Sequence, residues 1–153
     1  MEILEIKKYP DAVLRKKCEA VKAVTAQEKR LFEDMLFTMH TFKGVGLAAP
    51  QVGLAKRLIV ADVGGRMIKL ANPEIISSSG SDKMVEGCLS IPERTVEIKR
   101  FYEVTVRGLN EKGERVEIEA KGLLARVLQH EIDHLRGKLI IDYLSPWKKL
   151  LMR

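Results

Sequence analysis

The spacing of apolar residues changes twice along this chain, and these changes constrain its fold more than any other feature. Apolar side chains recur at helical spacing over residues 26–42 and again over 123–135. Between these segments, short stretches alternate apolar with polar residues, as half-buried strands do. Tight turns separate several of these stretches, which favours antiparallel pairing. We therefore expect an α+β fold in which mostly antiparallel sheets pack around a central helix, formed by the second helical segment.

The first helical segment carries its own start and stop signals. Thr25 is a candidate N-cap, and Glu28, three residues later, would complete a capping box. We expect this helix to end before Gly44. A short helical turn is also expected near residues 10–16.

Strands are expected at several places in the middle of the chain. They are 58–63, 67–71, 96–99, 104–107 and 115–119. Because proline cannot donate to a strand ladder, Pro73 is expected to limit the second of them. The serine-rich stretch 77–82 is expected to be a polar loop. Residues 139–141 are expected to form a last strand before a short basic amphipathic end.

Length and composition exclude several classes of protein. The 153 residues suit one domain, which would span 1–153. No apolar run approaches the roughly 18 residues of a membrane span, and the first residues do not resemble a secretory signal. The net charge of +6 comes from 27 basic and 21 acidic residues in mixed order, without a nucleic-acid-binding motif. Two cysteines are too few for a disulfide scaffold. We therefore expect a cytoplasmic protein that neither enters a membrane nor reads a nucleic-acid sequence.

The strongest local signal is an H-E-x-x-H motif, from His130 to His134, in the second helical segment. Histidines four residues apart lie on one face of a helix, so both imidazoles can reach a single ion. Glu131 projects to one side, where it can approach a water on that ion without binding the ion itself. The alternative is an exposed helix with two unrelated histidines. It is disfavoured because the chain has only three histidines and because apolar residues surround these two.

A catalytic metal usually has a third protein ligand. After His134 the chain contains no histidine, and Asp142 is its only acid, so the third ligand is expected upstream. Cys88 is the best candidate, because a thiolate with two imidazoles suits zinc or ferrous iron. The alternative is that Cys88 is a small buried apolar residue. His40 competes for the role but lies on an apolar helix, and Cys18 is interpreted as structural or incidental.

The stretch 44–51 fits G-x-G-x-x-A, a dinucleotide-binding pattern, but it follows a helix and runs into Pro50. That pattern requires a strand before it and a helix after it, so we reject the dinucleotide interpretation. The glycines still allow the backbone to approach a ligand, and the amide of Gln51 could donate to a developing oxyanion. The alternative is a helix C-cap followed by an ordinary loop.

Together, three motifs resemble the signature motifs of one family. GVGLAAPQ at 44–51, EGCLS at 86–90 and QHEIDHLRG at 129–137 are similar, in order and separation, to those of the peptide deformylases. The resemblance covers nearly the whole chain. It implies a metal-dependent hydrolase of the bacterial type, which removes the N-formyl group from the formyl-methionine of nascent polypeptides and releases formate.

The resemblance also implies roles for individual residues. The metal ligands would be Cys88, His130 and His134, with ferrous iron favoured and zinc, nickel or cobalt able to occupy the site. Glu131 would be the catalytic acid and base, and the Gln51 side chain and the Leu89 N–H would stabilise the oxyanion. Gly46 would contact the peptide through its backbone. The methionine pocket would be lined by Val45, Met84, Leu123 and Val127. Arg126 stands one helical turn before His130, where an apolar lining residue would fit equally well.

Two other functions compete with this one. An H-E-x-x-H peptidase would cut internal peptide bonds, although the missing downstream ligand speaks against it. A basic ribosome- or RNA-associated protein could hold a structural metal, but structural zinc normally has four protein ligands and only three candidates are found. The expected partners are nascent formyl-methionyl peptides, and a transient contact with ribosomes is a further hypothesis from the excess positive charge.

Overall fold

The structure, a computed structural model, describes residues 1–151 of the chain. The helices are α1 (Ala26–Thr41), α2 (Gly122–His134) and α3 (Pro146–Leu150). The strands are β1 (Gly46–Ala48), β2 (Leu58–Val63), β3 (Arg66–Ser79), β4 (Asp82–Cys88), β5 (Ile91–Arg100), β6 (Glu103–Leu109) and β7 (Arg115–Lys121). Short 3-10 turns are η1 (Ala12–Arg15), η2 (Ala49–Val52) and η3 (Ile140–Tyr143). The α+β prediction is confirmed, as is the short helical turn near residues 10–16.

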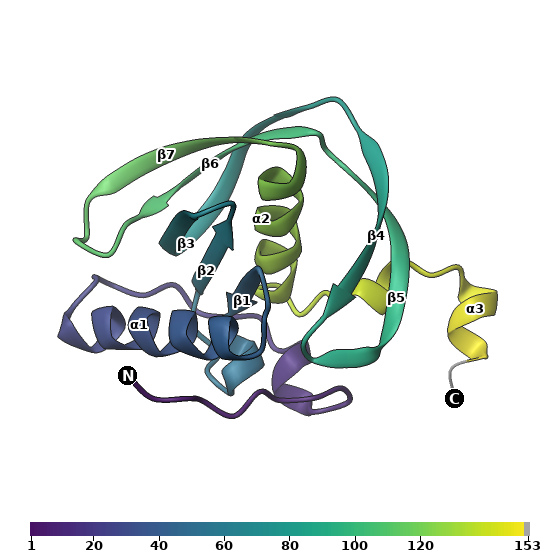
Figure 1. Ribbon diagram of the computed structural model, residues 1–153, viewed down its shortest axis with the longest axis horizontal. Helices are drawn as coiled ribbons and strands as arrows, with labels where there is room; N and C mark the ends of the chain where they lie inside the picture. Colours follow the sequence, from purple (N-terminus) through teal and green to yellow (C-terminus); the bar gives the residue numbers. More distant parts are fainter. Residues whose placement is uncertain (152–153) are drawn as a thin grey trace.

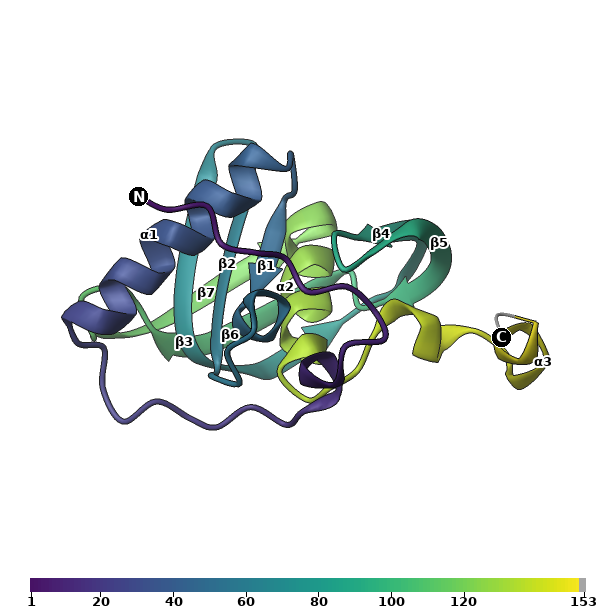
Figure 2. The same cartoon turned by 90° about the horizontal axis from the view of Figure 1, so that it is seen from below.

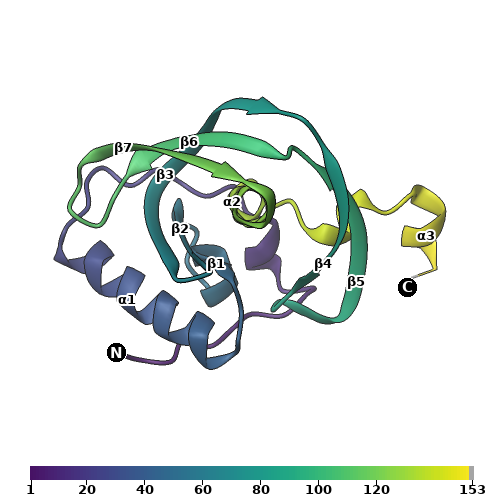
Figure 3. The same cartoon turned by 45° about the horizontal axis from the view of Figure 1, so that its top comes forward.

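The strands form a five-stranded sheet and a separate two-stranded ribbon. The sheet has the order β1-β2-β3-β6-β7, the ribbon pairs β4 with β5, and every pairing is antiparallel. Helix α2 lies between them, with the sheet on one side and the ribbon on the other (Figure 1). Figure 3 looks nearly along α2 and shows the strands curving around it. The predicted central helix is therefore confirmed.

One face of α2 packs on the sheet through apolar side chains at helical spacing. Leu124, Leu128, Ile132 and Leu135 are buried in one cluster with Ile59, Ile68, Leu70, Val104 and Val106 from the strands. The strand residues alternate, so each strand sends every second side chain to this face. This cluster fixes α2 against the sheet and so sets the positions of the side chains on the other face of the helix.

Helix α1 begins with the predicted capping box. The Thr25 side chain accepts a hydrogen bond from the backbone N–H of Gln27, and the Glu28 carboxylate accepts one from the Thr25 N–H at 2.8 Å. These bonds satisfy N–H groups that a helix start leaves without partners. The helix ends at Thr41, one residue before the predicted end, and its buried face packs on β1 and β2 in a second apolar cluster.

The prediction that Pro73 limits its strand is wrong. Strand β3 continues through Pro73 to Ser79 and pairs with β6 beyond it. The register shifts between Ala71 and Glu74, and Asn72 there has a φ of +52°. Such a bulge takes proline out of the hydrogen-bond ladder, so the missing N–H costs nothing.

The predicted polar loop over 77–82 is also wrong. Ser77, Ser78 and Ser79 pair with β6, and only a tight turn at Gly80 joins β3 to β4. Gly80 has a φ of +67°, a conformation that favours glycine. The alternation rule missed this strand because both of its faces are polar at that end.

The predicted last strand over 139–141 is a 3-10 turn instead. The Asp142 side chain accepts a hydrogen bond from the Leu139 N–H at 2.9 Å, which caps this turn. The buried Leu139, Ile140 and Ile141 pack on the ribbon without joining it. Beyond them, α3 projects from the body with Trp147 exposed (Figure 2). Within residues 1–151, no helix is long and apolar enough to span a membrane.

Candidate metal centre and catalytic pocket

Three side chains that could bind a metal meet at the inner face of α2. His130 and His134 lie one helical turn apart, and their Nε2 atoms are 3.3 Å from each other. The end of β4 brings Cys88 to the same place, with its Sγ atom 3.5 Å from the His134 Nε2. One ligand atom from each residue lies within 4.8 Å of the other two. The structure thus brings together the three residues that the sequence singled out.

The chemistry of this cluster fits a divalent cation. A soft thiolate and two imidazoles are ligands that zinc and ferrous iron accept. Burial opposes a positive charge here, but nearby Glu131 and Cys88 raise the pKa of His130 well above its ordinary value. Burial lowers the pKa of His134 well below its ordinary value, which favours the neutral form that binds metals.

Glu86 holds His130 in place, and the sequence analysis did not identify it. Its Oε1 atom lies 2.8 Å from the His130 Nδ1, so a proton on Nδ1 leaves Nε2 free to bind a cation. Burial alone would raise the pKa of Glu86, but hydrogen bonds from Arg100 and His130 lower it to about 2. The sequence could have pointed to Glu86, because it stands two residues before Cys88 in the same motif.

A buried ionic network extends behind Glu86. Arg100 donates to both Glu86 oxygens, at 2.7 and 2.8 Å, and to the Asp133 Oδ2 at 2.8 Å. The Tyr143 hydroxyl donates to the same Asp133 oxygen at 2.5 Å. Burial and the nearby Asp133 raise the pKa of Tyr143 to about 12. The ribbon, α2 and η3 are therefore tied together by charges directly behind the metal ligand.

Gln51 is buried beside the cluster and is held at both ends of its amide. Its Oε1 accepts a hydrogen bond from the Ala48 N–H at 2.9 Å. Its Nε2 is 3.5 Å from the Cys88 Sγ and 3.2 Å from the Ser90 Oγ, to both of which it can donate. Ser90 is fully buried, and the sequence analysis missed it although it lies in the Cys88 motif. The amide is thus aimed at the cluster by contacts on either side.

Glu131 lies next to the cluster in a space that only glycine leaves open. A Cβ atom at Gly46 would lie 2.5 Å from the Glu131 Oε2 and 2.7 Å from the Val127 Cγ1. The same Glu131 oxygen is 3.9 Å from the His130 Nε2, and Oε1 is buried with no hydrogen-bond partner among the described residues. Burial raises the pKa of Glu131 to about 7. A carboxyl group in this position can hold or release a proton near neutral pH.

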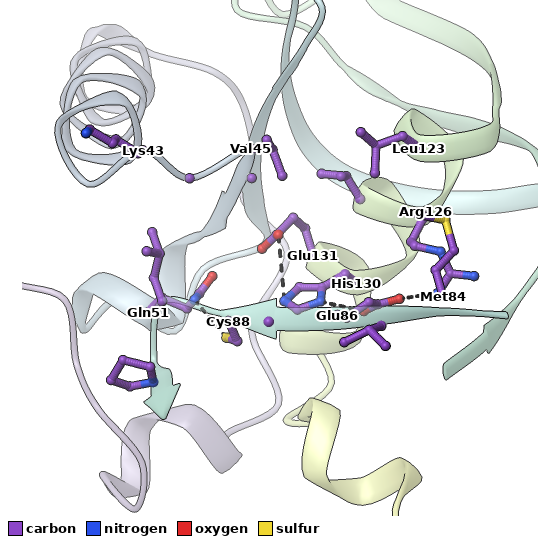
Figure 4. Close-up of a pocket in the computed structure, with 17 residues that line it drawn as sticks. Lys43, Val45, Gln51, Met84, Glu86, Cys88, Leu123, Arg126, His130 and Glu131 are labelled. Carbon is purple, nitrogen blue, oxygen red and sulfur yellow. Dashed lines mark hydrogen bonds and ion pairs between the residues drawn. The ribbon is translucent and has the colours of Figure 1, made fainter. Parts of the chain in front are cut away.

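A cavity of about 430 Å³ opens in front of these groups (Figure 4). Its lining includes every residue that the sequence analysis assigned to catalysis or substrate binding, and two of the three candidate metal ligands, Cys88 and His130. Glu86 and Arg126 also line it. Val45, Met84 and Leu123 stand half-exposed at its rim, and Val127 is buried within it. The backbone oxygen of Leu89 accepts a hydrogen bond from the Lys8 Nζ at 3.1 Å. A mainly apolar pocket therefore leads to the metal-binding cluster.

The two remaining candidates lie elsewhere. His40 is at the exposed end of α1, where its Nε2 is 2.7 Å from the Asp62 Oδ2, and it is not part of the cluster. Cys18 is half-buried against the apolar core of α2, and this burial raises the pKa of its thiol. His40 therefore lies outside the group that contains Cys88, and Cys18 packs against the apolar core.

Known proteins are similar to this chain in sequence and in fold. The family model described as "Polypeptide deformylase" matches residues 3–150. The peptide deformylase of Thermodesulfovibrio yellowstonii is 52% identical over all of this chain and 96% of the relative, and that of Halothermothrix orenii is 52% identical over 93% and 94%.

Solved structures of peptide deformylases are also similar to this chain. A peptide deformylase from Legionella pneumophila superposes with a TM-score of 0.93 at 45% identity, over 97% of this chain and 90% of that one. One from Ehrlichia chaffeensis, in complex with actinonin, superposes with a TM-score of 0.95 at 39% identity, over 99% and 94%. Because the family model matches residues 3–150 and a relative is similar over the full length, this chain belongs to the polypeptide deformylase family.

Proposed function

We propose that this protein removes the N-formyl group from polypeptides that begin with formyl-methionine, and releases formate. Membership of a metal-dependent deformylase family supports the reaction. The observation that carries the proposal is the convergence of Cys88, His130 and His134 beside Glu131, at the inner end of an apolar cavity. Ferrous iron is the favoured metal, and zinc, nickel and cobalt are compatible with the same ligands.

Each ligand residue has a role that its surroundings support. Cys88, His130 and His134 would hold the cation, and Glu86 would keep the His130 ring oriented through Nδ1. When bound, a divalent cation supplies the Lewis-acid charge that makes water nucleophilic near neutral pH.

Glu131 transfers a proton from the attacking water to the leaving amine. It takes a proton from the attacking water as the water oxygen bonds to the formyl carbon. When the carbon–nitrogen bond breaks, Glu131 delivers that proton to the leaving amine, and formate departs. Burial raises the pKa of Glu131 above that of an exposed carboxyl group, which makes its carboxylate a better base for the water proton.

Gln51 and Leu89 stabilise the negative charge that develops on the formyl oxygen. The Gln51 amide is buried and already fixed, so it needs no reorganisation as the charge forms. The Leu89 N–H is the second donor in this proposal. Loss of one such donor typically costs about 10²–10³ in rate.

The cavity selects the substrate by size. Gly46 brings the backbone against Glu131, which leaves room for a formyl group and excludes larger acyl groups. The methionine side chain would occupy the pocket lined by Val45, Met84, Leu123 and Val127. Beyond it, the peptide would extend along β1 and β4, which are end strands of their sheets among the described residues. Main-chain pairing of this kind suits many different nascent chains.

The wider assignments follow from this substrate. We propose that residues 1–153 form a single catalytic domain that meets nascent chains in the cytoplasm, with a transient ribosome contact favoured by the net charge of +6. We expect the protein to bind neither a membrane nor a specific nucleic-acid sequence.

Formate release from a formyl-methionyl tripeptide tests the function. Protein loaded with ferrous iron without oxygen is expected to release one formate per peptide and to leave every internal peptide bond intact. The matched acetyl-methionyl peptide is expected to remain unchanged. Cleavage of internal bonds would favour the peptidase alternative, and no reaction with any peptide would favour the non-catalytic alternative.

A further inference from the structure

The N-terminal segment, residues 1–9, contacts both elements that carry the proposed oxyanion donors. Figure 2 shows it, in purple, passing across α1 and continuing to η1. The backbone N–H of Lys7 donates to the Gln51 oxygen at 2.7 Å, and the N–H of Tyr9 donates to the Ser90 oxygen at 2.9 Å. Gln51 belongs to η2, and Ser90 belongs to the turn between β4 and β5. The segment therefore bridges two elements that lie far apart in the sequence.

One side chain of this segment reaches the same turn. Because Cys88 pairs with Ile91, only Leu89 and Ser90 form the turn between β4 and β5. The Lys8 Nζ donates to the Leu89 oxygen at 3.1 Å, and the backbone of the next residue holds the Ser90 oxygen. Both carbonyl groups of the turn are therefore held by the N-terminal segment.

The direction of the Leu89 carbonyl is linked to that of the Leu89 N–H. Only the φ and ψ angles of this residue separate the two groups. A carbonyl that is held from outside therefore limits the directions that the N–H can take. The ammonium of Lys8 suits this task, because a charged donor makes a stronger hydrogen bond than a neutral one.

Alignment of this kind matters for catalysis. A donor stabilises a developing oxyanion best when it already points at the place where the charge will form. A donor that must first turn gives up part of that stabilisation as reorganisation. The effect is absent from the bound substrate, whose formyl oxygen does not yet carry the charge, so it changes kcat rather than KM.

Resting on the proposed deformylase function, we propose that Lys8 is a positioning residue for the oxyanion donors. Its ammonium holds the Leu89 carbonyl and so keeps the Leu89 N–H aligned with the Gln51 amide. The N-terminal segment thus takes part in the reaction without touching the substrate.

Lys8→Met tests this contact, because it keeps the length of the side chain and removes its donor. With metal-loaded protein and a formyl-methionyl tripeptide, we expect kcat to fall about 3- to 10-fold and KM to stay within about twofold. Lys8→Arg is the rescue variant, since a guanidinium also donates to a carbonyl oxygen, and it is expected to keep at least about half of the wild-type kcat. Lys17→Met is the matched control. It removes an exposed lysine that makes none of these contacts, so its kcat is expected to equal that of the wild type.

Three further measurements separate positioning from other effects. Metal content by elemental analysis and the midpoint of urea unfolding are expected to be the same in all four proteins. The ratio of wild-type to Lys8→Met kcat is expected to persist at about 0.5 M salt, because salt screens charges that act over a Debye length more than it weakens a direct contact.

An unchanged kcat in Lys8→Met overturns the proposal, and so does a loss that appears only in KM. A loss of kcat that follows metal content, that disappears at high salt or that Lys8→Arg does not rescue overturns it as well. All of these outcomes leave the wild-type protein active. Absence of formate with the wild-type protein would instead contradict the deformylase function itself.

Discussion

The two sides of helix α2 are built from different chemistry. The side facing the five-stranded sheet is apolar, with Leu124, Leu128 and Ile132 buried among strand side chains. The side facing the β4–β5 ribbon is ionic, since Arg126 and His130 both contact Glu86 there, and Asp133 contacts Arg100. The same helix therefore stabilises the fold on one side and positions a site on the other.

The difference shows what each kind of contact is suited to do. Apolar burial is stabilising but not directional, so it holds the helix without fixing any single atom. Buried ion pairs add little net stability, because desolvation opposes their attraction, but their geometry is fixed. A metal ligand such as His130 needs fixed geometry, and it lies on the ionic side.

The largest expected effect is catalytic and lies on the ionic side. Glu131→Gln removes the group that moves the proton while keeping its shape. We expect kcat for formate release to fall about 10³-fold. Metal content by elemental analysis is expected to stay at the wild-type level. Near-normal turnover by the metal-loaded variant would exclude Glu131 from the mechanism.

Glu86→Gln tests the network directly. It removes the negative charge that faces the guanidinium groups of Arg100 and Arg126, and it weakens the hydrogen bond that orients His130. We expect metal affinity to fall about 10- to 100-fold and the metal-free protein to lose on the order of 3 kcal/mol at neutral pH.

The same variant has a definite pH dependence. Because the folded pKa of Glu86 is about 2, below its ordinary 4.5, its stabilisation is present above pH 4.5 and is lost as the pH falls towards 2. Urea unfolding of both metal-free proteins should therefore show a difference that shrinks below pH 4.5. A difference that does not change with pH would contradict this.

Leu128→Ala sharpens the comparison from the apolar side. Leu128 is fully buried in the cluster between α2 and the sheet. We expect the cavity left behind to lower the free energy of unfolding by about 3 kcal/mol. In the fraction that stays folded, kcat should change less than twofold, as measured at a temperature well below the unfolding midpoint. A large loss of kcat without loss of stability would contradict the claim that the apolar side of α2 serves stability and the ionic side positions the site.

Ser90→Ala has the smallest expected effect, because it removes a neutral hydrogen bond. The Gln51 amide would lose one of its anchors, and we expect kcat to fall about 5- to 10-fold with little change in KM. In a Gln51→Ala background the same substitution should cost nothing further. Additive losses in this double-mutant cycle would show that Ser90 does not act through Gln51.

Periodicity predicted the apolar parts of this fold well. It placed α1, α2 and most strands, because side chains that face a core must repeat with the backbone period. Periodicity failed where hydrogen bonding, rather than apolar burial, sets the local structure. These places are the bulge that carries Pro73 within β3, the strand pairing of Ser77–Ser79, and the turn that Asp142 caps.

The site divides in the same way. Cys88, His130 and His134 were predictable because metal ligands must be particular residue types at particular spacings. Glu86, Ser90 and Arg126 depend on contacts between segments 14 to 44 residues apart, such as Glu86 with Arg100 and His130 or Ser90 with Gln51, which no local pattern encodes.

The central claim is that Cys88, His130 and His134 share one cation. Elemental analysis of the wild-type protein, Cys88→Ala and Cys18→Ala, all purified anaerobically with ferrous iron, tests it most directly. Close to one metal ion per chain is expected in the wild-type protein and in Cys18→Ala, since Cys18 lies apart from the cluster in the apolar core. Cys88→Ala should retain only a small fraction of that amount after gel filtration. Equal metal in all three proteins would contradict the account.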